Sequence, residues 1–142
     1  LLLVGLGERN KADLDGLRAA AGLAASKAVG MKAGSLAMLM HGEWAGGETP
    51  GAEALGRVLA EGAFFGGYRY DEFASETNKE RPGKLAVEVI DESAGRVKEL
   101  GRGVRMGAIF GEAQSFARTI MNRPPNLMYP AALAEEAKKL AA

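Results

Sequence analysis

Short apolar runs alternate along the chain with longer apolar stripes at helical spacing. Runs of four to six residues occupy positions 1–4, 36–40 and 85–90, the last with an alternating, partly polar face. Runs of this length are typical of strands, and continuous ones suit a sheet that is covered on both faces. The pattern therefore predicts three strands, each followed by a segment with helical periodicity.

The first helix is predicted to begin after Asp13, whose carboxylate is suited to capping the first turn. Its apolar positions recur at intervals of three and four residues, which places them on a single face. Because this face is mostly alanine, we expect close packing against a neighbour. Gly30 and Gly34 bracket the end of the helix. The apolar positions are Leu14, Leu17, Ala21, Ala24 and Ala28.

A second helix is predicted to begin with Thr49 as its N-cap and Pro50 at its first helical position. Gly66-Gly67 is expected to end it. Residues 68–83 are charged and include Arg81-Pro82-Gly83, a sequence that favours an exposed loop. The apolar positions of this helix are Ala54, Leu55, Val58, Leu59, Gly62 and Phe65.

A third, long helix is predicted beyond Ser93 and up to about Met121. The prolines at 124 and 125 must end it, because proline lacks the amide hydrogen and clashes with the preceding turn. Pro130 then begins a last helix, with Leu133, Ala137 and Leu140 on one face. The apolar stripe through which this long helix is expected to pack consists of Met106, Ile109, Phe110, Ala113, Phe116, Ala117 and Ile120.

The alternation of strands and helices predicts an α/β fold, with a mostly parallel sheet flanked by helices and followed by a long connecting helix. Three strands are few for a free-standing sheet. The chain also begins at Leu1 inside a predicted strand and stops at Ala142 inside a predicted helix. We therefore expect it to be part of a longer protein.

The composition narrows the classes of partner. The 142 residues are 47% apolar and 25% charged, which is typical of a globular protein. Eighteen basic residues balance eighteen acidic ones, so the overall charge gives no support for a nucleic-acid partner. No apolar run approaches the roughly 20 residues of a membrane span, and we expect no membrane partner. The absence of cysteine excludes disulfides and thiolate zinc sites.

Two features near predicted strands are candidates for a functional site. Gly5-Leu6-Gly7 has the first two glycines of a dinucleotide-binding turn, but Asn10 stands where the third belongs. We interpret it as a tight turn between a strand and a helix. His41 is the only histidine, and neither a zinc site nor a catalytic triad forms without converging partners. We interpret His41 as a structural residue at a strand end.

Two acidic pairs and one aromatic cluster are further candidates for a site. Asp71-Glu72 and Asp91-Glu92 are neighbours in sequence whose side chains diverge, so we interpret them as solvated loop charges. Tyr68, Tyr70 and Phe73 lack the interleaved basic residues of a base-stacking platform, and packing against the sheet is the preferred interpretation. We therefore assign no catalytic, cofactor-binding or metal-binding residue to this chain.

One motif resembles a known family. The run Ala117-Arg118-Thr119-Ile120-Met121-Asn122-Arg123-Pro124-Pro125-Asn126 is similar to the A-R-x-x-x-N-x-P-P-N run of the leucyl aminopeptidases, also called cytosol aminopeptidases. Leu3 to Gly7 resembles a strand end of that family, and Glu61 to Tyr70 resembles its E-G…Y-x-F segment. Thr119 stands where the family usually has an acidic residue, and Tyr129 where it has Thr or Ser.

The resemblance implies an architecture. Residues 1–94 would be a partial N-terminal α/β domain, 95–122 a connecting helix and 123–142 the start of a catalytic domain. Two divalent metals, zinc or manganese, would bind in that catalytic domain. The family's F-D-S-G-G and N-T-D-A-E-G-R runs, which carry metal ligands, do not occur in this sequence. We therefore expect no metal or other cofactor in this chain.

The resemblance also implies a function. The chain would be the non-catalytic N-terminal portion of a cytoplasmic metalloaminopeptidase, a hydrolase that removes N-terminal residues from peptides as a hexamer. Its role would lie in assembly and in access to the active site, with its own catalytic domain as partner. The alternative is a stand-alone binding or scaffold module with a protein or nucleic-acid partner.

Overall fold

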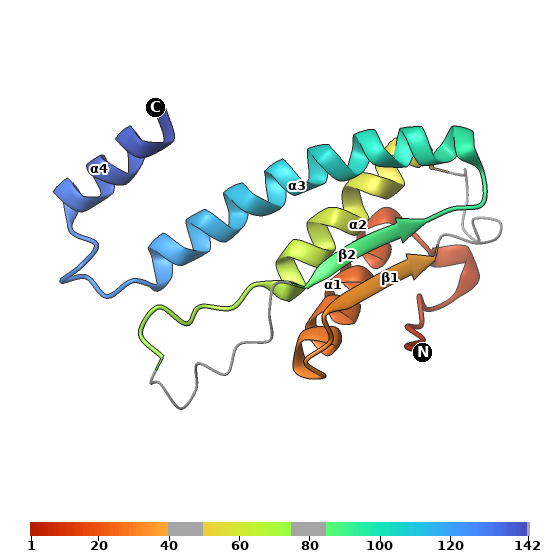
Figure 1. The fold of residues 1–142 in the computed structure, drawn as a ribbon, viewed down its shortest axis with the longest axis horizontal. Coiled ribbons are helices and arrows are strands. Elements are labelled where there is room, and N and C mark those ends of the chain that lie inside the picture. The colour runs from red at the N-terminus through yellow and green to blue at the C-terminus, as the bar shows by residue number, and fades with distance from the viewer. Residues whose placement is uncertain (40–49, 75–84, 142) are drawn as a thin grey trace.

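The computed structural model describes residues 1–39, 50–74 and 85–141, which form a layer of helices against a small parallel sheet. In chain order, the elements are a 3-10 turn (Arg9–Lys11), α1 (Leu14–Gly30), β1 (Ser35–Leu39), α2 (Ala52–Gly67), β2 (Ala86–Ile90), α3 (Ala94–Asn122) and α4 (Pro130–Ala141). Figure 1 shows α3 as the longest element, with α4 beyond its C-terminal end. The α/β class and the long helix are confirmed.

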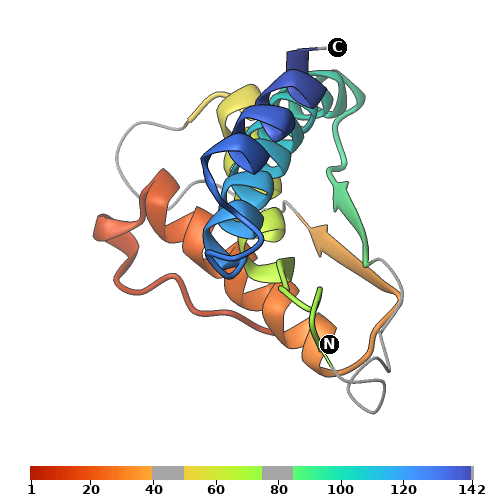
Figure 2. The same ribbon diagram turned by 90° about the vertical axis from the view of Figure 1, so that its left-hand side faces the viewer.

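The sheet of the described residues consists of β1 and β2 in parallel, with Ser35 opposite Ala86 and Leu39 opposite Ile90. Figure 2 shows both strands on the same side of α1, α2 and α3. Met38 and Val89 point toward this helical layer and pack on the core. The buried core itself comes from the helices and consists of Leu17, Ala21, Ala52, Leu55, Val58, Leu59 and Leu100.

The predicted strand over residues 1–4 is wrong. These residues belong to no helix or strand, and Leu1 and Leu3 are almost fully exposed. A strand is held by hydrogen bonds to a neighbouring strand. In the part of the chain that the structure describes, the only strand pair is β1 with β2. The apolar character of positions 1–4 therefore leads to no strand here.

Helix α1 agrees with its sequence pattern. Asp13 Oδ1 accepts a hydrogen bond of 2.7 Å from the Gly16 amide, which caps the first turn as predicted. The predicted alanine face is buried against α2, and Gly30 is the last helical residue. Helix α2 begins later than predicted, because Gly51 is its N-cap and provides no side-chain hydrogen bond. Thr49, the predicted cap, lies outside the described residues.

Helix α3 packs through glycine rather than through its apolar stripe. Its buried residues are Leu100, Gly103, Gly107 and Gly111, which recur at intervals of three or four and face α2. The predicted stripe is wrong: Met106, Ile109 and Phe110 are exposed. Small side chains let two helix backbones approach closely, and the contact area then comes from the backbones themselves. The apolar side chains of α3 are left on other faces of the helix.

The C-terminal part follows the predicted breaks. Helix α3 ends at Asn122, directly before the residues that lead into the two prolines. Helix α4 begins at Pro130 and has no buried residue, so Leu133 and Leu140 remain exposed. Among the described helices, none combines the length and the apolar character that a membrane crossing requires.

Candidate functional site

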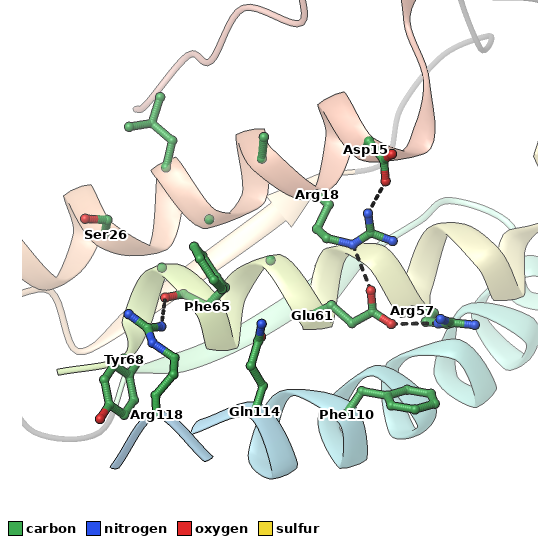
Figure 3. A pocket seen from close by; sticks show the side chains of 15 residues that line it. Asp15, Arg18, Ser26, Arg57, Glu61, Phe65, Tyr68, Phe110, Gln114 and Arg118 are labelled. Carbon is green, nitrogen blue, oxygen red and sulfur yellow. Dashed lines mark hydrogen bonds and ion pairs between the residues drawn. The ribbon is translucent and has the colours of Figure 1, made fainter. Parts of the chain in front are cut away.

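The C-terminal end of α3 lies against the C-terminal end of α2. Arg118 Nη1 donates a hydrogen bond of 3.1 Å to the Phe65 carbonyl oxygen, in the last turn of α2. Its guanidinium carbon lies 4.0 Å from the ring centroid of Tyr68 and 4.8 Å from that of Phe65. The last carbonyl groups of a helix have no partner within the helix. Arg118 therefore caps α2 while it stacks on two aromatic rings (Figure 3).

The hydroxyl group of Tyr68 connects the same two helices. Thr119 Oγ1 donates to the Ser115 carbonyl oxygen at 2.9 Å, and it lies 3.2 Å from Tyr68 Oη. Since the Thr119 proton is used in this way, the Tyr68 hydroxyl donates to Thr119. Asn122 Nδ2 in turn donates to Tyr68 Oη at 3.2 Å. Thr119, where the family pattern has an acidic residue, thus fits a closed set of hydrogen bonds.

Arg123 contacts two segments that are far apart in sequence. Its Nε donates to Glu72 Oε2 at 2.9 Å, in the segment that follows α2, and its Nη1 donates to Glu136 Oε1 on α4 at 3.2 Å. The hydrogen bond from Arg123 lowers the pKa of Glu72. Hydrogen bonds from Lys139 first, and from Arg123 as well, lower the pKa of Glu136. Both carboxylates are therefore ionised partners of Arg123 at neutral pH.

These contacts form one unit, which we call the α3 junction. It consists of Arg118, Thr119, Asn122 and Arg123 together with their partners Phe65, Tyr68, Glu72 and Glu136. Four residues of a ten-residue run of sequence thus hold the end of α2, the segment after it and α4. The unit combines hydrogen bonds, one arginine stacked on two rings and one arginine held by two carboxylates, and its contacts join separate segments of the chain.

A groove of about 960 Å³ runs across the outer face of the helices, between α1 and α3 and above α2 (Figure 3). Glu61 lies on its floor and accepts hydrogen bonds from Arg57 Nε at 2.6 Å and from Arg18 Nε at 2.8 Å. Arg18 also pairs with Asp15. Arg57 lies 4.9 Å from the centroid of the Phe110 ring. One end of the groove is thus an ordered network of charges, and Arg118 lies toward the other.

The charge network changes the ionisation of Glu61. Burial is the largest single influence on the pKa of Glu61 and raises it, because the charged form loses hydration. The hydrogen bonds from Arg57 and Arg18 act in the opposite direction, and together with the two positive charges they outweigh burial. The net result is a pKa below the ordinary value, so Glu61 is ionised at neutral pH.

The acidic pairs singled out in the sequence have structural partners. Asp91 was expected to be a solvated charge, but its side chain is only 5% exposed. Its Oδ1 accepts from the Ser93 amide at 2.8 Å, and its Oδ2 lies 3.3 Å from Arg96 Nε, at the start of α3. Glu72 is held by Arg123 rather than being free in solvent. The solvated-charge interpretation is therefore wrong for Asp91 and incomplete for Glu72.

The remaining sequence candidates form no common site. Gly7 has a φ of 83°, which favours glycine, but a 3-10 turn and not an α-helix follows it, and no strand precedes it. The Gly5-Leu6-Gly7 turn is thus not a dinucleotide-binding turn. His41 lies outside the described residues. Tyr70 packs edge-on against Phe73, with 6.1 Å between ring centroids. Tyr68 lies under Arg118.

The described residues hold no group of three or more His, Cys, Asp or Glu side chains arranged to bind a metal ion. The polar features they do contain, the α3 junction and the charged groove, were not predicted as sites. The spacing of four between Arg57 and Glu61 indicates an ion pair on one helix face. No signal in the sequence indicates that Arg18 or Arg118 comes to the same groove, because their partners lie 43 and 53 residues away.

The chain is similar in sequence to known proteins. A family model described as "Cytosol aminopeptidase family, N-terminal domain" matches residues 1–77. The probable cytosol aminopeptidase of Roseiflexus castenholzii is 32% identical over 141 residues, which cover 99% of this chain and 28% of that protein. The one of Aquifex aeolicus is 39% identical over 90 residues, covering 63% and 17%. The chain thus spans less than a third of these relatives.

Solved structures with the same fold are similar over nearly the whole chain. The bottromycin maturation enzyme BotP superimposes with a TM-score of 0.71 at 32% identity, covering 97% of this chain and 27% of that one. Its complex with Mn gives a TM-score of 0.74 at the same identity, covering 97% and 26%. The similarity therefore includes α3 and α4, beyond the residues that the family model matches.

Proposed function

Because the chain belongs to the cytosol aminopeptidase family through its N-terminal domain, we propose that it forms the non-catalytic part of an enzyme that removes N-terminal residues from peptides. Its similarity to the relatives covers about a quarter of their length, which supports a portion rather than the whole of such an enzyme. The reaction itself is a property we propose for the longer protein.

The metal centre of that enzyme is proposed to lie outside this chain. The described residues do not fit it, since they contain no metal-binding group of acidic or histidine side chains. BotP has been solved in complex with Mn, which supports the proposal of a divalent metal. We propose that manganese or zinc binds in the catalytic domain of the longer protein. Such metals activate a water molecule and polarise a carbonyl group.

The role proposed for this chain is to fix the position of a catalytic domain and so to control access to its active site. The observation that carries this role is the pair of contacts made by Arg123, which joins the segment after α2 to α4. We propose a domain division of 1–94, 95–122 and 123–142, in which α3 is the connection and the α3 junction sets the direction of the chain that follows.

The proposed partners are the enzyme's own catalytic domain, further copies in a hexamer and the peptide substrate of the longer protein, in the cytoplasm. The exposed apolar side chains of α4, Leu133 and Leu140, are consistent with a covering domain.

The coding frame beyond Ala142 and a peptidase assay test this proposal together. We expect the 142-residue chain to release no product from leucine p-nitroanilide with Mn²⁺ or Zn²⁺, and the product of a longer frame to release it. In that longer protein, Arg123→Gln should lower the rate, whereas Lys138→Gln, which breaks only an exposed pair within α4, should not. A frame that stops directly after Ala142 would contradict the enzyme proposal and leave the stand-alone binding or scaffold module.

A further inference from the structure

Among the residues that the structure describes, Arg118 carries a positive charge without an acidic partner. The other two arginines of the groove, Arg18 and Arg57, are both held by Glu61. Arg118 instead stacks on Phe65 and Tyr68, and its one hydrogen bond goes to a backbone carbonyl oxygen. No ion pair of the described residues involves it. A guanidinium group has five N–H donors in one plane, so stacking leaves its edge free for a carboxylate.

Three large apolar side chains line the groove, one from each helix. Phe65 lies beside Arg118, and Phe110 lies beside Arg57 at the charged end. Leu23 of α1 is 50% exposed, Phe65 of α2 is 54% exposed and Phe110 of α3 is 48% exposed. Half of each side chain is therefore in contact with water, although the three belong to one concave surface. An apolar ligand group placed among them would remove that area from water, which is favourable in proportion to the area buried.

The shape of the groove suits an extended ligand. Its floor is formed at Gly62 and Gly66, where α2 packs so closely on Gly22 of α1 that no side chain rises between them. A volume of about 960 Å³ is at the upper end of the range for small-ligand sites. Gln114 points from α3 into the groove between Arg118 and Phe110 (Figure 3). Its amide group offers both a donor and an acceptor, which is what a peptide backbone requires.

The charges of the groove indicate which charge its ligand would carry. Three arginines face two carboxylates, Asp15 and Glu61, which leaves one positive charge in excess. Because Arg18, Arg57, Asp15 and Glu61 satisfy one another, the excess lies at Arg118. We propose that this groove binds a short acidic peptide segment of a partner protein, with a carboxylate on Arg118 and a neighbouring apolar side chain between Leu23 and Phe65. The balanced charge of the chain and a single free guanidinium group disfavour nucleic acid.

Two capped tetrapeptides provide the probe for this site. One has glutamate at both ends with leucine and phenylalanine between them, and the other has glutamine in place of both glutamates. Each is titrated into the ¹⁵N-labelled 142-residue chain and followed by its amide chemical shifts. We expect the acidic peptide to shift Phe65, Gln114 and Arg118 saturably, and the glutamine peptide to bind about three- to fivefold more weakly, as for an exposed ion pair.

Variants at Gln114 test the sign of the charge without touching a residue that holds the fold. Gln114→Glu should weaken the acidic peptide about threefold or more, and Gln114→Lys should strengthen it. Ala113→Glu, on an exposed position of the same helix that does not line the groove, should leave the affinity unchanged. Equal affinity for the two peptides, equal binding by Gln114→Glu and Gln114→Lys, or tighter binding of a single-stranded oligonucleotide would each overturn the proposal.

Discussion

The α-carbon of Gly107 on α3 lies against the carbonyl oxygen of Arg57 on α2, so closely that no side-chain carbon fits between them. One turn earlier, Gly103 has the same relationship to the carbonyl oxygen of Glu53. Residues four apart lie above one another on a helix face, so these contacts form a continuous line along the two helices. The contact between α2 and α3 therefore depends on the absence of side chains at these positions.

Substituting Gly107 by alanine should push α3 away from α2. We expect the free energy of unfolding to fall by about 1–3 kcal/mol, which is typical of overpacking a tight interface. Gly101→Ala is the matched control, because an added methyl group there would meet only the end of the flexible Arg105 side chain, at 3.7 Å. There alanine should stabilise the helix by up to about 1 kcal/mol. Urea denaturation measures both, and a change of the same sign in the two variants would refute the packing argument.

At Gly103 and Gly107, the apolar pattern of the sequence predicts the wrong packing face. Periodicity of apolar residues located the helices, and Asp13, the two strands and the break after Asn122 followed from local chemistry. The same reasoning assigned the wrong face of α3 to the core, since it treats glycine as neutral or unfavourable in a helix. The face of α3 that packs on α2 is the one that lets the two backbones approach closely. This depends on both helices and not on α3 alone.

In the sequence, the α3 junction is visible only as a motif that resembles one of a known family. The run from Ala117 to Asn126 resembles that of the family, but its residues gave no indication of their partners. Phe65, Tyr68 and Glu72 lie more than fifty residues earlier, and the contacts depend on α2 and α3 ending side by side. Hydrogen bonds between such distant segments can be identified only when the arrangement of the helices is known.

Replacing Arg123 by glutamine should loosen α4. None of its residues is buried, so the contact from Arg123 to Glu136 is a main tether to the rest of the chain. We expect the amides of α4 to exchange with deuterium about two- to fivefold faster, in keeping with the loss of an exposed ion pair, while α1 and α2 exchange as before. Lys138→Gln, which removes a pair within α4 alone, serves as control. Unchanged exchange in Arg123→Gln would show that other contacts hold α4.

Tyr68 and Asn122 should be energetically coupled. Tyr68→Phe removes the hydroxyl group that donates to Thr119 and accepts from Asn122, and should lower the free energy of unfolding by about 0.5–1.5 kcal/mol. Asn122→Ala should cost less in the Tyr68→Phe background than in the parent chain, since its partner is already gone. A double-mutant cycle in urea measures the coupling, and additivity within about 0.3 kcal/mol would mean that the hydrogen bond contributes nothing.

The Glu61 network should make stability sensitive to acid. Hydrogen bonds from Arg57 and Arg18 hold the pKa of Glu61 below its ordinary value of 4.5, against the upward effect of burial. A group whose pKa is lower in the folded chain binds protons more readily when unfolded. Its contribution is therefore complete above about pH 5. It is lost as the pH falls through the lowered pKa of the folded state.

Glu61→Gln isolates this contribution. The variant should be less stable than the parent chain at pH 7, because Arg57 and Arg18 lose a charged acceptor, and the difference should shrink as the pH is lowered toward 3. Glu135→Gln, on the exposed surface of α4, controls for the loss of one negative charge outside the network. Urea midpoints between pH 7 and pH 3 provide the measurement. A difference between Glu61→Gln and the parent chain that stayed constant across this range would mean that packing, and not the ionised carboxylate, accounts for the role of Glu61.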